Sequence, residues 1–67
     1  MKFLNSHKGF QLGDKAKCIS SPIDAPIDLG DIVTINQIVE DNVGDVVFYF
    51  IYRGNIHKML DWRFEKV

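Results

Sequence analysis

The sequence predicts a small all-β protein, a single five-stranded barrel with a short N-terminal arm, and three observations support this. An apolar residue followed by Gly-Asp occurs three times, in LGDKAKCIS (12–20), LGDIVTINQ (29–37) and VGDVVFYFI (43–51), and alternating or β-branched residues follow each pair. No window has the apolar spacing i, i+3, i+4, i+7 of an amphipathic helix. A chain of 67 residues is one domain, and its 46% apolar content suffices for a folded core.

Each Gly-Asp pair predicts a turn that begins a strand. Gly adopts a positive φ without steric cost, and an Asp side chain can bond to the backbone nearby. The first pair therefore introduces a strand over residues 14–19. Ala16 and Cys18 share one face of this strand, and Lys15 and Lys17 share the other. Residues 1–9 would form the arm that precedes a barrel domain of residues 10–67.

A loop is predicted from Ser20 to Leu29, with the sequence SSPIDAPIDL. It contains two prolines and no strand pattern. It is long for this chain, and long loops in compact domains often carry function. The carboxylates of Asp24 and Asp28 are therefore candidate binding groups.

The remaining strands are expected at 31–40, 46–53, 55–60 and 64–67. The segment Arg53-Gly54-Asn55 reads as the tight turn of a hairpin. The segment 60–63 is short enough for one 3-10 turn before the last strand. Phe64 and Val67 are expected to point inward from that strand.

The segments GDKAKCI, LGDIVTINQIVED and DWRFEKV resemble small SH3-like or KOW-like barrels common in bacteria and their phages. The resemblance covers roughly residues 10–67. It implies an SH3-like barrel with a long first loop and a 3-10 turn before the last strand. It also implies a small phage or prophage protein that acts in the host cytoplasm by binding and modulating a host protein.

Cysteine content and hydropathy bear on the cellular location. Cys18 is the only cysteine, so no disulfide can form within the chain, and a reducing compartment is expected. No run of 18 apolar residues could span a membrane. The N-terminal MKFLNSHKG turns polar by Asn5, which does not fit a signal peptide. A cytoplasmic protein without membrane contact is the expectation.

Four residues are candidates for catalysis or metal binding. Cys18, His57 and Asp61 could serve as nucleophile, base and orienting group, but Cys18 lies among apolar neighbours and reads as a small core residue. No nucleophile elbow or glycine run for an oxyanion hole accompanies them. His7 completes the set of plausible metal ligands, yet no Cys-x2-Cys or His-x3-His spacing occurs. We therefore expect no enzyme activity, no metal and no cofactor.

Charge is segregated along the chain. Residues 18–52 contain no Lys or Arg but six carboxylates, and all eight basic residues lie outside this stretch. An acidic loop would attract and steer a basic protein partner. The alternative is a nucleic-acid-associated barrel whose basic edge binds phosphates through Lys15, Lys17, Arg53, Lys58 and Arg63. The net charge of −1 favours the protein partner.

The run VVFYFIY is apolar on both faces of its strand. Val46, Phe48, Phe50 and Tyr52 form one face, and Val47, Tyr49 and Ile51 form the other. Only one face can point into a small barrel, so the other is either covered by Phe3 and Leu4 of the arm or exposed. Exposed aromatic patches mark interaction sites. A partner-binding surface is therefore predicted at Tyr49, Ile51, Trp62, Asp24 and Asp28, in a monomer or a homodimer.

Overall fold

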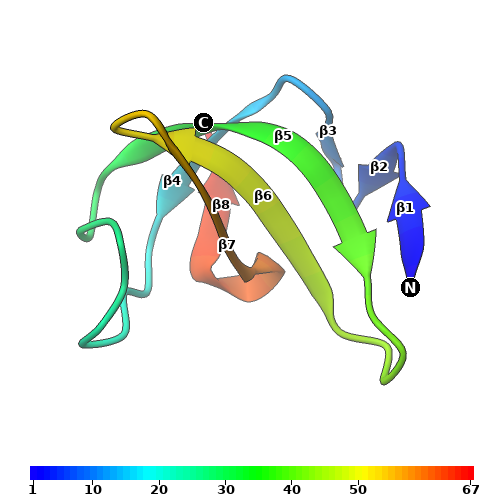
Figure 1. Ribbon diagram of the computed structural model, residues 1–67. Coiled ribbons are helices and arrows are strands. Elements are labelled where there is room, and N and C mark those ends of the chain that lie inside the picture. The colour runs from blue at the N-terminus through cyan, green and yellow to red at the C-terminus, as the bar shows by residue number, and fades with distance from the viewer.

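The computed structural model describes all 67 residues and is all-β (Figure 1). The strands predicted from the sequence are confirmed as β4 to β8, each to within one residue at either end, and the 3-10 turn precedes β8. No helix is long and apolar enough to cross a membrane. The elements in chain order are β1 (Lys2–Leu4), β2 (Ser6–His7), β3 (Phe10–Gln11), β4 (Lys15–Cys18), β5 (Ile32–Glu40), β6 (Val46–Tyr52), β7 (Asn55–Leu60), the 3-10 turn η1 (Asp61–Arg63) and β8 (Phe64–Lys66).

One antiparallel sheet has the strand order β7-β6-β5-β4-β8. The long, curved β5 runs through its centre (Figure 1). It pairs with β6 along one edge, with a register shift between Ile35 and Gln37, and with β4 and then β1 along the other. The end strands β7 and β8 are joined by η1 and do not pair with each other, so hydrogen bonds do not close the sheet into a barrel.

The Gly-Asp pairs form the predicted turns, and two of them share one geometry. In both Gln11–Asp14 and Asp28–Asp31, the last Asp N–H donates to the carbonyl three residues earlier. The carboxylate of that Asp accepts from the first N–H of the turn, at 2.9 and 3.0 Å. The glycines have φ of +88° and +87°, which side chains rarely adopt. The sequence repeat is therefore a repeated turn.

The third turn uses a different carboxylate. Asp41 Oδ1 accepts hydrogen bonds from the N–H groups of Val43 and Asp45, at 3.0 and 2.9 Å. Gly44 again has a positive φ, of +91°. In all three cases a strand begins directly after the Asp, as the sequence predicts.

The core is entirely apolar. Phe48 and Phe50 of β6 are fully buried, and their rings pack with those of Phe10 and Phe64. No polar or charged residue is as fully buried as these core residues. The expectation for Phe64 is confirmed, but that for Val67 is wrong, because Val67 is exposed. The two positions are three residues apart, and extended backbone places such residues on opposite faces.

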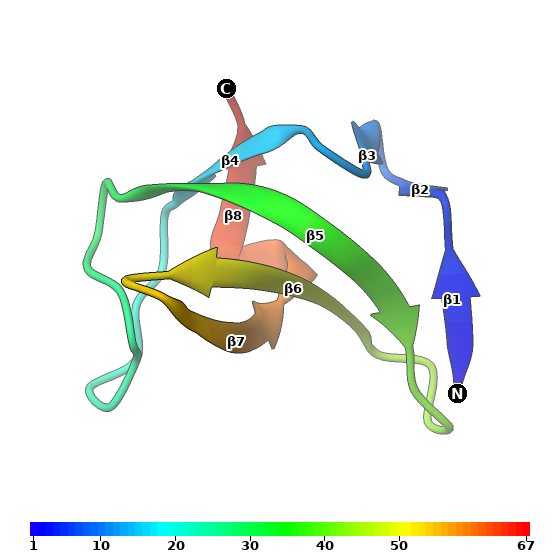
Figure 2. The same cartoon turned by 45° about the horizontal axis from the view of Figure 1, so that its top comes forward.

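The arm adds strands of its own. β1 pairs with the C-terminal half of β5, and β2 forms a two-residue hairpin with β3. The turn of that hairpin has positive φ at both Lys8 and Gly9, as a type I′ turn requires. In the view of Figure 2, β1 lies at the opposite side of the molecule from the long loop of residues 19–31.

Candidate functional site

The outer face of β6 and β7 exposes large apolar side chains. Phe50 points into the core, so its neighbour Ile51 points outward. Ile56 is the cross-strand partner of Ile51, and paired residues of antiparallel strands share a face. Ile51 is 56% exposed and Ile56 is 64% exposed. Tyr49, two residues before Ile51, is half-buried on the same face.

The arm lies beside this face and does not cover it. Phe3 pairs with Val39 of β5 and is 67% exposed, whereas its neighbour Leu4 packs against the core. Val39 is buried, yet it stands outside the core cluster. Its cross-strand partner on the other side is Val47 of β6. The arm therefore leaves the Tyr49/Ile51 face uncovered, and Phe3 of β1 adds a further exposed apolar side chain to the same side of the sheet.

Trp62 lies in η1 with its side chain about half exposed. The Arg63 guanidinium stacks on the indole, with 4.1 Å from Cζ to the ring centroid. Arg63 Nη1 also donates to Ser20 Oγ at 3.1 Å. The Arg63 guanidinium therefore contacts both the Trp62 ring and Ser20 at the start of the long loop. Trp62 is thus a surface residue and not a plug of the core.

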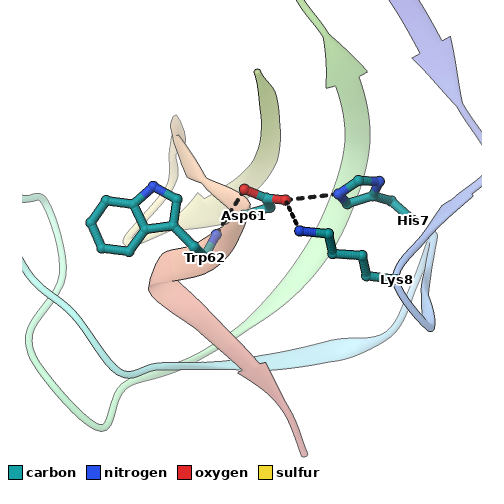
Figure 3. Close-up of polar contacts among 4 residues, drawn as sticks. All are labelled: His7, Lys8, Asp61 and Trp62. Carbon is teal, nitrogen blue, oxygen red and sulfur yellow. Dashed lines mark hydrogen bonds and ion pairs between the residues drawn. The ribbon is translucent and has the colours of Figure 1, made fainter. Parts of the chain in front are cut away.

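Asp61 fixes the backbone of η1 and ties it to the arm (Figure 3). Its Oδ1 accepts from the Trp62 N–H at 2.8 Å, and its Oδ2 lies 2.7 Å from His7 Nε2 and 3.7 Å from Lys8 Nζ. The side chains of Asp61 and His7 are mostly buried. In Figure 3 the indole of Trp62 points away from these groups. The pair therefore positions η1 without contacting the half-exposed Trp62 ring.

The long loop carries its two candidate carboxylates in the open. Asp24 and Asp28 are both exposed. The loop ends at Asp31, whose Oδ2 accepts from the Asp28 N–H and from the Tyr52 hydroxyl at 2.9 Å. The backbone N–H of Asp28 and then the Tyr52 hydroxyl lower the pKa of Asp31, and the same hydroxyl bond, with desolvation, raises the pKa of Tyr52. This contact fixes the end of the acidic loop to the end of β6.

The five candidate phosphate-binding cations are distributed over several elements. Lys15 and Lys17 lie on the outer face of β4, which is separated from β7 in the sheet by β5 and β6. The other three each lie over an aromatic ring: Arg53 over Tyr52, Lys58 over Tyr49 and Arg63 over Trp62. None of the five belongs to a salt bridge.

The residues considered for catalysis or metal binding do not form one cluster. Cys18 is buried, and its thiol donates to the Ser20 carbonyl at 3.6 Å. The His57 ring packs beside Phe50. No group of three or more His, Cys, Asp or Glu is placed to hold a metal ion, and no pocket is found. Within this set, His7 and Asp61 are the residues in direct contact.

Sequence reasoning identified Tyr49 and Ile51, overlooked Ile56, and named Phe3 only as a possible cover of this face. Ile56 could have been found from the tight turn at Arg53-Gly54, because a two-residue turn sets the register that pairs Ile56 with Ile51. The pairing of Phe3 with Val39 has no such local signal, since 36 positions separate them and no turn connects β1 directly to β5.

Comparison with known proteins does not add to this description. No family model, no curated protein and no solved structure matches the chain.

Proposed function

We propose that this chain is a non-catalytic protein-interaction module that holds its partner on the outer face of β6 and β7. The observation that carries the proposal is the exposure of the cross-strand neighbours Ile51 and Ile56, each more than half exposed on one sheet face, with the exposed Phe3 of β1 farther along the same sheet. Contiguous exposed apolar side chains are typical of interaction sites. Tyr49 belongs to this face, and Trp62 follows directly after β7 in η1.

The proposal agrees with the energetics of small interfaces. Covering an exposed Ile side chain contributes on the order of 1.5–3 kcal/mol. A stable interface buries about 800 Å² on each partner. That is roughly a fifth of the 4439 Å² surface of this protein.

The acidic loop would act in the approach of the partner. Asp24 and Asp28 are exposed and lie on a loop whose end is fixed to β6 through Asp31 and Tyr52. Exposed rim charges change the rate of association more than the final affinity. We therefore assign steering to these carboxylates, and most of the binding energy to the apolar face.

We further propose that β4 to β8 form a five-stranded SH3-like barrel. The strand order, the 3-10 turn before the last strand and the pairing of β8 with β4 support this. If the chain is a phage product, as the sequence resemblance implies, its partner is a host protein.

The test compares capture of partners from lysate by three forms of the protein. The double variant Ile51→Ser with Ile56→Ser removes the central apolar pair. As a control, Val43→Ser removes an even more exposed apolar residue in the β5–β6 turn. Folding is checked by circular dichroism. We expect the parent and the Val43 variant to capture the same partner, and the double variant to fail to capture it. Equal capture by all three forms would contradict the proposal.

Two further variants separate the roles of the other residues. Trp62→Ala should weaken binding by about 2 kcal/mol if the indole is an anchor. Asp24→Lys with Asp28→Lys should slow association with a smaller change in affinity. If binding instead falls steeply with salt and depends on Lys15 and Lys17, the nucleic-acid alternative is the better one.

A further inference from the structure

The edge of β7 has unpaired backbone groups. β7 is the last strand of the sheet and pairs with β6 alone (Figure 2). Apart from the bonds within the sheet and the 3-10 turn, for which Leu60 is the N-cap, no backbone hydrogen bond involves residues 55–60, and no side chain bonds to their backbone. A strand edge of this kind is a template for pairing with another chain.

The register identifies which groups are free. Arg53 and Gly54 both have positive φ, as in a type I′ two-residue turn, so Tyr52 and Asn55 form the hydrogen-bonded pair that closes the hairpin. Hydrogen bonding to β6 then recurs at every second residue of β7. The N–H and C=O groups of Ile56, Lys58 and Leu60 therefore point away from β6. The side chains of these residues lie on the proposed interaction face.

We propose that the partner binds by adding an antiparallel strand to β7, and that this strand carries an acidic residue opposite Lys58 and apolar residues opposite Ile56 and Leu60. The inference rests on the proposed protein-binding function and specifies its partner. Backbone pairing at an exposed sheet edge supplies affinity, and alternate side chains supply specificity. Antiparallel pairing is chosen because it is slightly more stable per residue than parallel pairing.

Charge selects an acidic strand from another protein over a second copy of this one. Lys58 is exposed, lies over the Tyr49 ring at 6.0 Å and has no carboxylate partner. Symmetric pairing of two copies about Lys58 would place two lysines opposite each other, and like charges in opposite positions destabilise a strand pair. A Glu or Asp on a foreign strand would meet Lys58 favourably.

The neighbouring cations extend this preference. Arg53 precedes β7 and Arg63 follows it by three residues, and neither belongs to a salt bridge. Their guanidinium groups lie on the rings of Tyr52 and Trp62. Both ends of the β7 segment therefore carry a cation that could meet acidic residues beyond the paired strand.

The test uses an end-capped synthetic heptapeptide, Thr-Val-Thr-Glu-Thr-Val-Thr, titrated into the full chain and followed by amide NMR shifts and hydrogen exchange. With Glu opposite Lys58, the N–H groups of Glu and both Val face β7, and those of the inner Thr residues face solvent. We expect slower exchange at Ile56, Lys58 and Leu60. N-methylation of the Glu amide should weaken binding at least tenfold, and N-methylation of the next Thr amide should change it less than twofold. Any other pattern, or no binding, overturns strand addition.

A charge exchange tests the partner chemistry. The variant Lys58→Glu should bind the Glu peptide at least tenfold more weakly than the parent does. The same variant should bind the matching peptide with a central Lys. Failure of this charge exchange overturns the acidic assignment. Tighter binding of an oligouridine than of the peptide, or dimerisation through β7 at the same protein concentration, would also overturn it. The Ile51 and Ile56 capture experiment is independent, so strand addition can fail while the apolar interaction face stands.

Discussion

Replacing Ile27 with Ala should destabilise the protein strongly, whereas the same replacement of Ile23 should have almost no effect. Both residues are the centre of a Pro-Ile-Asp tripeptide in the long loop, at 22–24 and 26–28. The side chain of Ile27 is 2% exposed and belongs to the core cluster, but that of Ile23 is 99% exposed. A Ser21 Oγ–H also donates to the Ile27 carbonyl at 2.8 Å, which holds the loop over its anchor.

The expected loss of stability follows from the buried Ile27 side-chain atoms that the Ala replacement removes. Ile-to-Ala replacements in a core cost about 2–5 kcal/mol, and a loop that can settle into the gap belongs near the lower end, at about 2–3 kcal/mol. The whole domain is stable by about 3–10 kcal/mol, so the Ile27 variant should remain folded but melt roughly 10–20 °C lower. Ile23→Ala should stay within about 0.5 kcal/mol of the parent.

Urea unfolding followed by Trp62 fluorescence measures both variants, and Ile27→Val provides a milder step of about 1 kcal/mol. Amide exchange over residues 20–29 should accelerate in the Ile27 variant and not in the Ile23 variant, because the anchor and not the proline content orders the loop. Equal stabilities for the two Ala variants would refute the assignment of Ile27 as the anchor.

Three other changes give distinct outcomes. Because the pKa of Asp31 is lowered from its usual value of 3.8, its carboxylate stabilises the fold above pH 3.8, and this stabilisation is lost as the pH falls through the folded pKa. Because the pKa of Tyr52 is raised from 10.0, its hydroxyl stabilises the fold below pH 10.0, and this stabilisation is lost as the pH rises through the folded pKa. Tyr52→Phe should therefore flatten the fall in melting temperature at both extremes, and an unchanged profile would reject the bond. His7→Ala should speed amide exchange in the arm, because it removes the contact with Asp61. Its melting temperature should fall by less than that of Asp61→Ala, because Asp61 also accepts from the Trp62 N–H. Equal exchange in the parent and the His7 variant would show that the arm docks without this pair. Gly54→Ala should cost about 1–2 kcal/mol in urea unfolding from its φ of +81° alone, since nothing lies within 4 Å of the added Cβ; a neutral result would contradict the turn geometry.

Strand positions were predictable from the sequence because turn chemistry and alternation are local. Gly-Asp turns fixed the starts of β4, β5 and β6, and Arg53-Gly54 fixed the hairpin. Which of the two Pro-Ile-Asp tripeptides has its Ile in the core was not predictable, because the two local sequences are identical and only the tertiary structure distinguishes them. The pairing of β1 with β5 was also missed, because it too depends on tertiary structure and joins segments far apart in the sequence.

The candidate site divides in the same way. Alternation along β6 correctly placed Ile51 outward and Phe50 inward. Whether the arm covers Ile51 depended on tertiary structure, since Phe3 is positioned by a pairing with Val39 that no short-range pattern encodes. The stacking of Lys58 on Tyr49 follows from a register that the hairpin turn could have revealed.

An interior without buried polar groups leaves few directional bonds to specify how the strands align. Alignment then rests on the turns, where five glycines take a positive φ and carboxylates bind turn amides. Cores tolerate apolar exchanges of similar volume, but slipping a strand by one residue turns every side chain to the wrong face. In a mutational scan, exchanges among Val, Ile and Leu inside should therefore be accepted more often than any substitution at these surface glycines, so that positions sensitive to sequence lie on the outside of this protein as well as in its core.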